Sequence, residues 1–231
     1  MAETATERFA RWRLRDLLVR YPGLRIMPSA GGGLRLVGDV QFRVTGPDGT
    51  TLEDGYEVEL QIPADFPHST PTARETGGRI ARTFHKLEGD LLCLGAPTEL
   101  RIRLMMSPTL LTFVERVVIP YLFGHTYFQA HGVMPFDELA HGNEGLLQHF
   151  ADLFGASSRE ATMEFVRAAS LRRRSANKLV CPCGRRRRLG RCHNRKVNRL
   201  RGLLGRTWFR QQLAVMGIEG VKPRAASPRQ N

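Results

Sequence analysis

Residues 55–71 constrain the fold more than any other stretch of the chain. Four apolar residues alternate there with polar ones: Tyr56, Val58, Leu60 and Ile62. A period of two is typical of an antiparallel strand with one buried and one wet face. Prolines at positions 63, 67 and 71 then exclude a helix and favour an extended path. The stretch therefore predicts a half-buried antiparallel strand that leads into an extended segment.

Helices and a further strand are expected around this stretch. Residues 6–21 carry apolar side chains near helical spacing and end at a Pro-Gly pair, and residues 34–44 are typical of a strand. Residues 109–123 predict a long buried helix that Pro120 kinks or shortens. Later helices are predicted from Asn143 to Phe154, and from a Ser157–Glu160 capping box to Ser170.

Charge is divided unevenly along the chain. Residues 1–158 hold 15 Lys+Arg and 19 Asp+Glu, whereas residues 159–231 hold 20 and 3. A basic block of this kind suits phosphate backbones, an acidic protein surface or anionic lipid, and composition does not choose among them. Charge and periodicity together predict four regions: a compact domain at 1–155, a helical basic linker at 156–178, a cysteine-containing basic region at 179–220 and a disordered tail at 221–231.

No run of 18 apolar residues occurs, so no membrane span is expected. The N-terminal residues carry acids and no apolar core of a secretory signal. We therefore expect a cytoplasmic protein without a membrane partner.

Three of the four cysteines lie within twelve positions, in the pattern C-x-C, eight residues, C-H. Four soft ligands on a polar turn suit a tetrahedral zinc ion: Cys181, Cys183, Cys192 and His193. The run resembles the SEC-C motif, with Arg185-Arg186 in place of its usual Ser-Gly. Protein fills all four positions, so the predicted zinc is structural. The alternative is a set of unmetallated thiols in a disordered tail.

Cys93 lies in a different setting, eight residues after His85 in the stretch Thr83-Phe-His-Lys-Leu-Glu-Gly-Asp-Leu-Leu-Cys-Leu-Gly95. A lone cysteine between leucines can simply be a small buried hydrophobe. However, the order of strand, proline-rich segment, His85 and Cys93-Leu94, followed by Met106-Ser-Pro108, resembles the ubiquitin-conjugating enzymes over residues 5–155. The continuation after the cysteine is closer to a bacterial branch found beside cyclic-oligonucleotide antiphage signalling genes (CBASS).

This resemblance implies an α+β fold with an N-terminal helix, an antiparallel meander, an active-site flap and C-terminal helices, followed by a small zinc-binding tail. It implies that Cys93 forms a thioester with the C-terminus of a partner, a cGAS-like nucleotidyltransferase, and passes it to a lysine of an acceptor protein. His85 would organise the flap. Leu87 departs from the family, which has asparagine there. Either backbone N–H groups around Gly89 to Cys93 replace that donor, or transfer is slow, or activity is lost.

Four histidines occur within 25 residues: His125, His131, His141 and His149. Their spacings fit no common zinc pattern, so we expect them to face solvent or brace loops. His141 is the candidate acid or base near the thioester.

Arginines crowd residues 172–210 and interleave with Leu200, Trp208 and Phe209. This mixture suits nucleic acid or an acidic surface, as well as a plain solvated face. Three functions therefore compete: a thioester-forming transferase, a non-catalytic ubiquitin-conjugating-like binding module with Cys93 in its core, and a nucleic-acid-binding protein acting through its basic tail.

Overall fold

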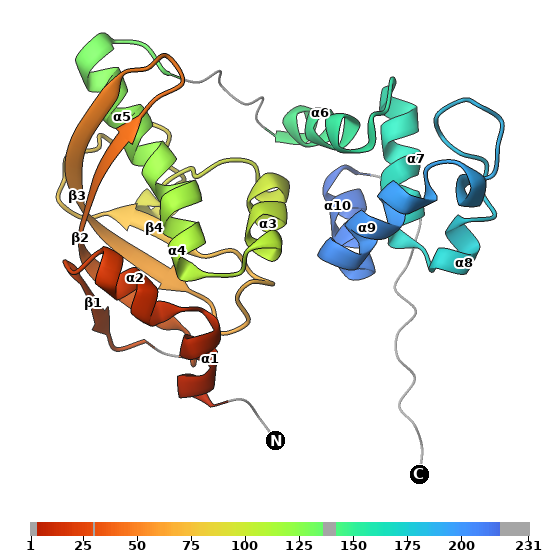
Figure 1. Cartoon of the computed structure of the whole chain (residues 1–231). Helices are drawn as coiled ribbons and strands as arrows, with labels where there is room; N and C mark the ends of the chain where they lie inside the picture. Colours follow the sequence, from red (N-terminus) through yellow and green to blue (C-terminus); the bar gives the residue numbers. More distant parts are fainter. Residues whose placement is uncertain (1–3, 30, 136–141, 218–231) are drawn as a thin grey trace. The chain divides into compact units, whose positions relative to one another are not determined.

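A computed structural model describes residues 4–29, 31–135 and 142–217. The chain forms two compact units, Met1–Leu139 and Ala140–Asn231. The first contains a sheet and helices, and the described part of the second is mainly helical (Figure 1). The α+β class is therefore confirmed.

The first unit is built on a four-stranded antiparallel sheet in the order β1-β2-β3-β4. Its strands are β1 (Leu24–Met27), β2 (Leu34–Thr45), β3 (Thr51–Ile62) and β4 (Thr72–Glu75). The register pairs Leu36 with Leu60 and Val40 with Tyr56. The four alternating apolar residues of β3 are at most 1% exposed, so the predicted buried face is confirmed.

Two short helices precede the sheet, α1 (Ala5–Arg11) and α2 (Leu14–Arg20), where the sequence predicts one. Thr4 and Glu7 form a capping box at the start of α1. The break falls at Arg13, whose φ of 55° is left-handed. It lets Trp12 turn into the core, where its indole N–H donates to the carbonyl of Phe66 at 3.1 Å.

The helical segment after the sheet continues further than predicted. It runs through α4 (Leu110–Phe113), a π-helical turn (Val114–Val118) and α5 (Ile119–His131), following α3 (Pro97–Met106). Pro120 lacks the N–H that would bond the carbonyl of Arg116. The guanidinium of Arg103 donates to that carbonyl instead. The proline is therefore accommodated inside the helical segment, and Figure 1 shows α2, α4 and α5 over one face of the sheet.

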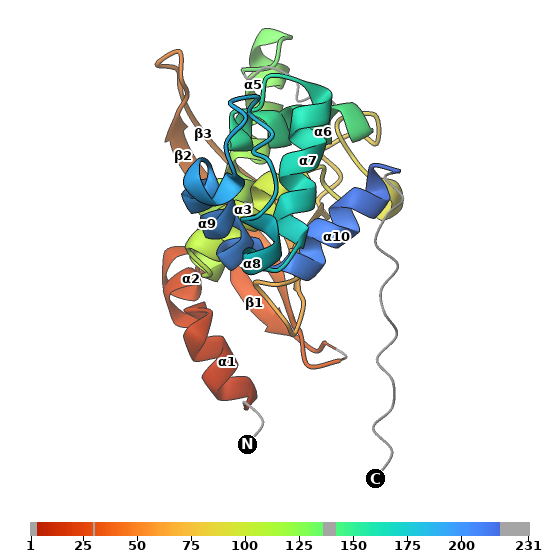
Figure 2. The same ribbon diagram turned by 90° about the vertical axis from the view of Figure 1, so that its right-hand side faces the viewer.

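In the second unit, helices gather around α7 (Arg159–Ser170), which contacts the four others (Figures 1 and 2). These are α6 (Gly142–Phe154), α8 (Arg173–Ala176), α9 (Asn194–Leu204) and α10 (Arg206–Val215). The N-cap of α7 is Ser158, whose hydroxyl accepts from the N–H of Ala161, one residue later than the predicted capping box.

The unit boundary lies ahead of the one expected after residue 155, because α6 packs with the later helices. The rings of Phe150 and Phe154 lie 6.2 and 6.4 Å from the ring of Phe209. Phe154 also stacks on Phe165 at 5.2 Å. All four rings are at most 1% exposed, so α6 supplies part of the core of the second unit.

None of the helices in the described ranges combines the length and apolarity needed to cross a bilayer. The predicted tail at 221–231 lies outside the described residues.

Candidate metal centre and thiol site

The cysteine-containing segment folds into a tight hairpin, residues 179–189. The N–H of Cys181 donates to the carbonyl of Arg187 at 2.7 Å, and a second bond joins Leu189 to Leu179 at 2.8 Å. Gly184, with φ of 77°, supplies the left-handed residue that the turn requires. The hairpin therefore places Cys181 and Cys183 at its closed end.

The other two candidate ligands follow a 3-10 turn at Leu189–Arg191 and lead directly into α9. His193 is the N-cap residue of that helix. The four ligands thus meet because the hairpin and the start of α9 lie next to each other.

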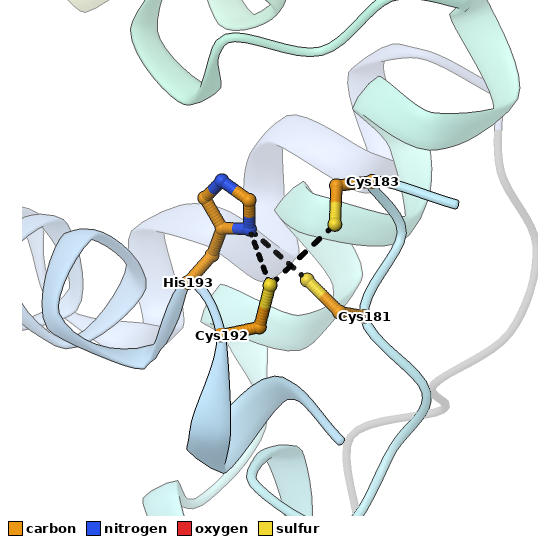
Figure 3. A group of neighbouring side chains, drawn as sticks. All are labelled: Cys181, Cys183, Cys192 and His193. Carbon is orange, nitrogen blue, oxygen red and sulfur yellow. Dashed lines mark hydrogen bonds between the residues drawn. The ribbon is translucent and has the colours of Figure 1, made fainter. Parts of the chain in front are cut away.

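The four side chains converge on a common centre (Figure 3). Their ligand atoms all lie within 4.8 Å of one another. Nδ1 of His193 is 3.2 Å from Sγ of Cys181 and 3.3 Å from Sγ of Cys192, and the sulfurs of Cys183 and Cys192 are 3.6 Å apart. The predicted group of four is therefore brought together and is suited to a metal ion.

These separations match the edges of a tetrahedron around zinc. With Zn–S of about 2.3 Å and Zn–N of about 2.0–2.1 Å, ideal edges are about 3.8 Å between sulfurs and about 3.6 Å between sulfur and nitrogen. The three edges given above are shorter than these values by a few tenths of an ångström, and the remaining separations between ligand atoms are at most 4.8 Å. The four atoms therefore surround a space close to the size that a zinc ion requires.

The thiols differ in burial. Burial raises the pKa of Cys181, which is 1% exposed, to about 12. The backbone N–H of Arg185 lowers the pKa of the half-exposed Cys183. Metal binding requires both thiols to lose their protons. The ring of Phe165 lies edge-on to His193 at 5.4 Å and fixes one side of the imidazole.

Cys93 lies at the end of the flap, which we define as residues 84–92. Its N–H donates to the carbonyl of His85 at 2.9 Å, and the N–H of Leu92 donates to Ala73 of β4 at 2.8 Å. The flap is thus tied to the sheet on one side and folded back on itself on the other.

Side chains fix the flap further. Lys86 donates to the carbonyl of Ile80 at 2.7 Å and Arg74 to that of Gly89 at 2.9 Å. The guanidinium of Arg82 binds the carboxylate of Asp90, with Nε 3.0 Å from Oδ1. These bonds hold the backbone that leads to Cys93 in one conformation.

Tyr121 of α5 holds the start of the flap. Its hydroxyl lies 3.0 Å from the carbonyl of Phe84 and 3.2 Å from that of His85. Burial, followed by the nearby charge of Cys93, raises the pKa of Tyr121, so the phenol keeps its proton. The sequence patterns did not mark Tyr121 as a site residue. Its signal was a polar tip within an apolar helical stretch, since a buried tyrosine hydroxyl usually finds a partner.

The thiol of Cys93 is free and half-buried, between the core and the surface. Leu87, in the position of the expected asparagine, is 55% exposed and offers no side-chain donor. The N–H groups of Leu92 and Cys93 are already bonded to carbonyls. Two of the backbone donors expected to replace asparagine are therefore engaged elsewhere.

The histidines do not gather into a site in the described residues. His125 is buried in α5, 4% exposed, with Nδ1 2.7 Å from the hydroxyl of Tyr56, so the expectation of a solvent-facing or loop position is wrong for this residue. Burial lowers its pKa. His131 is exposed against the ring of Tyr127, and His149 belongs to α6. His141 lies outside the described residues.

Asp54 is half-buried and is linked to His125 through the hydroxyls of Thr126 and Tyr56. Burial raises its pKa, but hydrogen bonds from Arg79 and from Thr126 outweigh this effect and lower the pKa to about 2. The guanidinium of Arg79 makes two bonds to the carboxylate, at 2.8 and 2.9 Å. This network braces the sheet against α5.

The aromatic residues of the basic region are core residues. Trp208 is 8% exposed and Phe209 is fully buried. The interleaved pattern suited stacking of these rings on bases, but their burial makes them unavailable for it. Most of the arginines between residues 172 and 199, in contrast, are exposed.

Comparisons with protein-family models, with curated proteins and with solved structures gave no match.

Proposed function

We propose that this protein is a ubiquitin-conjugating-like transferase that carries an acyl group as a thioester on Cys93. The observation that supports it is a free, half-buried cysteine at the end of a flap whose backbone is held by hydrogen bonds at several points. A rigid ledge of this kind suits positioning of an already activated acyl group. The α+β unit, with helices before and after an antiparallel meander, agrees with the fold that the resemblance implies.

The chemistry has two steps. The Cys93 thiolate attacks the carbonyl carbon of an incoming thioester, a new C–S bond forms, and the donor thiolate leaves. A neutral amine of the acceptor then attacks the same carbon, the Cys93 thiolate leaves, and the amine loses a proton to solvent or a nearby base. Each leaving group is a thiolate, so the reaction needs no redox partner or bound cofactor.

The resemblance supplies the partners of this proposal: the C-terminus of a cGAS-like nucleotidyltransferase as the acyl group and a lysine of another protein as the acceptor. Within the chain, the carbonyl of His85 and the hydroxyl of Tyr121 act as positioning groups, because they fix the backbone around Cys93.

We further propose that the metal bound by the second unit is zinc and that it is structural. The donor set of three thiols and one imidazole is the one that structural zinc sites use. Four protein ligands leave no open position for substrate or water. The ion would hold the hairpin at residues 179–189 to the start of α9.

A peptide thioester tests the transferase. The full chain is incubated with a fluorescent peptide that ends in glycine mercaptoethanesulfonate thioester, and the products are separated without reductant. We expect a dithiothreitol-sensitive adduct that mass spectrometry places on Cys93, and that free lysine discharges. Cys93→Ala should abolish the adduct, whereas the matched variant Cys183→Ala should keep it.

The alternative predicts a different result. In a non-catalytic binding module with Cys93 in its core, the folded chain would form no adduct, and iodoacetamide would label Cys93 only after denaturation. That outcome would overturn the transferase proposal. An adduct on Cys93 that Tyr121→Phe slows, without a change in melting temperature, would support the positioning role of the phenol.

A further inference from the structure

Arginines follow the C-terminal end of α7, and in the part of the chain that the structure describes they form no ion pair with a carboxylate. Residues 165–217 contain 16 Lys+Arg and no Asp or Glu. In the described part of the second unit the ion pairs are Arg159–Glu144 and Arg167–Glu164, both of which lie before this end. Among the described residues of this unit, no ion pair neutralises the cations that follow.

Two of these arginines donate hydrogen bonds to the last carbonyls of α7. Arg201 donates to the carbonyls of Ala168 and Ala169 at 2.7 and 3.1 Å, and Nε of Arg206 donates to that of Ser170 at 3.4 Å. A helix leaves its last carbonyls without partners, and cations there also interact favourably with its dipole. Each of the three side-chain nitrogens of Arg201 donates a hydrogen bond within the unit, so Arg201 is a structural residue. Arg206 donates to the helix end through Nε.

The caps draw further guanidiniums together. Burial, then Arg206 and Arg173, lower the pKa of Arg201. Burial, then Arg210 and Arg172, lower that of Arg206. Like charges are thus concentrated at one end of one helix, and an anion bound there relieves their repulsion.

We propose that Arg172, Arg173, Arg206 and Arg210 bind the phosphate backbone of a nucleic-acid duplex. Guanidinium forks match phosphate oxygens, and all four of these cations are arginines. Exposed arginines continue along the hairpin at 185–188 and onto α9, so the ligand is an extended polyanion and not a single phosphate.

The buried aromatics decide between duplex and single strand. Phe and Trp in the described part of the second unit are all at most 8% exposed: Phe150, Phe154, Phe165, Trp208 and Phe209. Single-strand binders depend on stacking of bases on aromatic rings. Without exposed rings, contacts are limited to phosphates and are independent of base sequence.

Fluorescence anisotropy with a 20-base-pair DNA duplex and the full zinc-loaded chain, over a series of salt concentrations, tests the proposal. The variant Arg172→Gln/Arg173→Gln/Arg210→Gln spares both helix caps. The control Arg15→Gln/Arg25→Gln/Arg43→Gln removes the same charge from exposed positions of the first unit. Each lost phosphate contact lowers the slope of log affinity against log salt by about 0.9.

We therefore expect the slope of the test variant to fall by about 2.7 and its affinity at 0.1 M salt to fall by about 500-fold, with zinc content and melting temperature unchanged. The control should keep the wild-type slope. Equal slopes in the two variants would overturn the proposal, as would tighter binding of a single strand of the same length. Binding to phosphatidylglycerol vesicles without binding to duplex would assign the surface to a membrane instead.

Discussion

Replacement of Cys183 by alanine is the cleanest perturbation of the metal centre. Its sulfur is one of the four converging ligand atoms, but its side chain is half-exposed. Cys181, in contrast, is 1% exposed and belongs to the core. Truncation of Cys183 therefore removes a ligand without opening a cavity, whereas truncation of Cys181 does both.

The magnitude follows from the ligand count. Structural zinc sites contribute about 10–16 kcal/mol at neutral pH, or about 2.5–4 kcal/mol for each of four ligands. Zinc affinity should thus fall by about 100- to 1,000-fold in Cys183→Ala. Because the ion binds the folded unit, the free energy of unfolding should fall with it at fixed free zinc.

The assay is a zinc titration against a chromophoric chelator, with thermal unfolding recorded in the presence and absence of EDTA. The wild-type protein should bind one zinc ion per chain, and its melting temperature should be lower in EDTA. Cys93→Ala, which removes the thiol of the first unit, is the matched control and should bind zinc like wild type. Equal zinc affinities for Cys183→Ala and wild type would refute the four-ligand site.

Three further changes have defined outcomes. Phe150→Ala should lower the free energy of unfolding of the second unit by about 3–5 kcal/mol; a calorimetric transition of that unit that does not move would contradict the place of α6 in its core. Folding lowers the pKa of Asp54 from 3.8 to about 2, so its carboxylate contributes roughly 2 kcal/mol to the free energy of unfolding. This contribution is complete above pH 4 and is lost as the pH falls toward 2. In Asp54→Asn, the free energy of unfolding measured in urea should therefore change less with pH across that interval. Arg103→Gln should lower the free energy of unfolding by about 1–3 kcal/mol. The loss should be smaller when Pro120→Ala is also present, because alanine supplies an N–H for the carbonyl of Arg116. If the losses of the two single variants add in the double variant, the proline is irrelevant to the role of Arg103.

Local patterns predicted the parts of the protein that depend on neighbours in sequence. The alternation at residues 56–62 identified the buried face of β3, and the spacing of Cys181, Cys183, Cys192 and His193 identified the four residues that converge. In both, the periodicity of the backbone or a short turn brings the side chains together.

Local patterns did not predict contacts between residues that are distant in the sequence. The apolar face of α6 is evident in the sequence, but its packing with Phe209, and hence the position of the unit boundary, is not. The arginines between residues 172 and 210 look equivalent, yet Arg201 is used to cap α7. The pinning of the flap by Tyr121 was equally hidden.

The sequence by itself determined which side chains avoid water and which four can hold a metal ion, because hydrophobicity and ligand chemistry belong to the residues. Only the tertiary structure decided which apolar faces meet, which charged groups donate hydrogen bonds to backbone carbonyls and how far Cys93 is exposed. These depend on the packing of segments tens of residues apart, and a local pattern carries no information about which of several complementary surfaces is chosen.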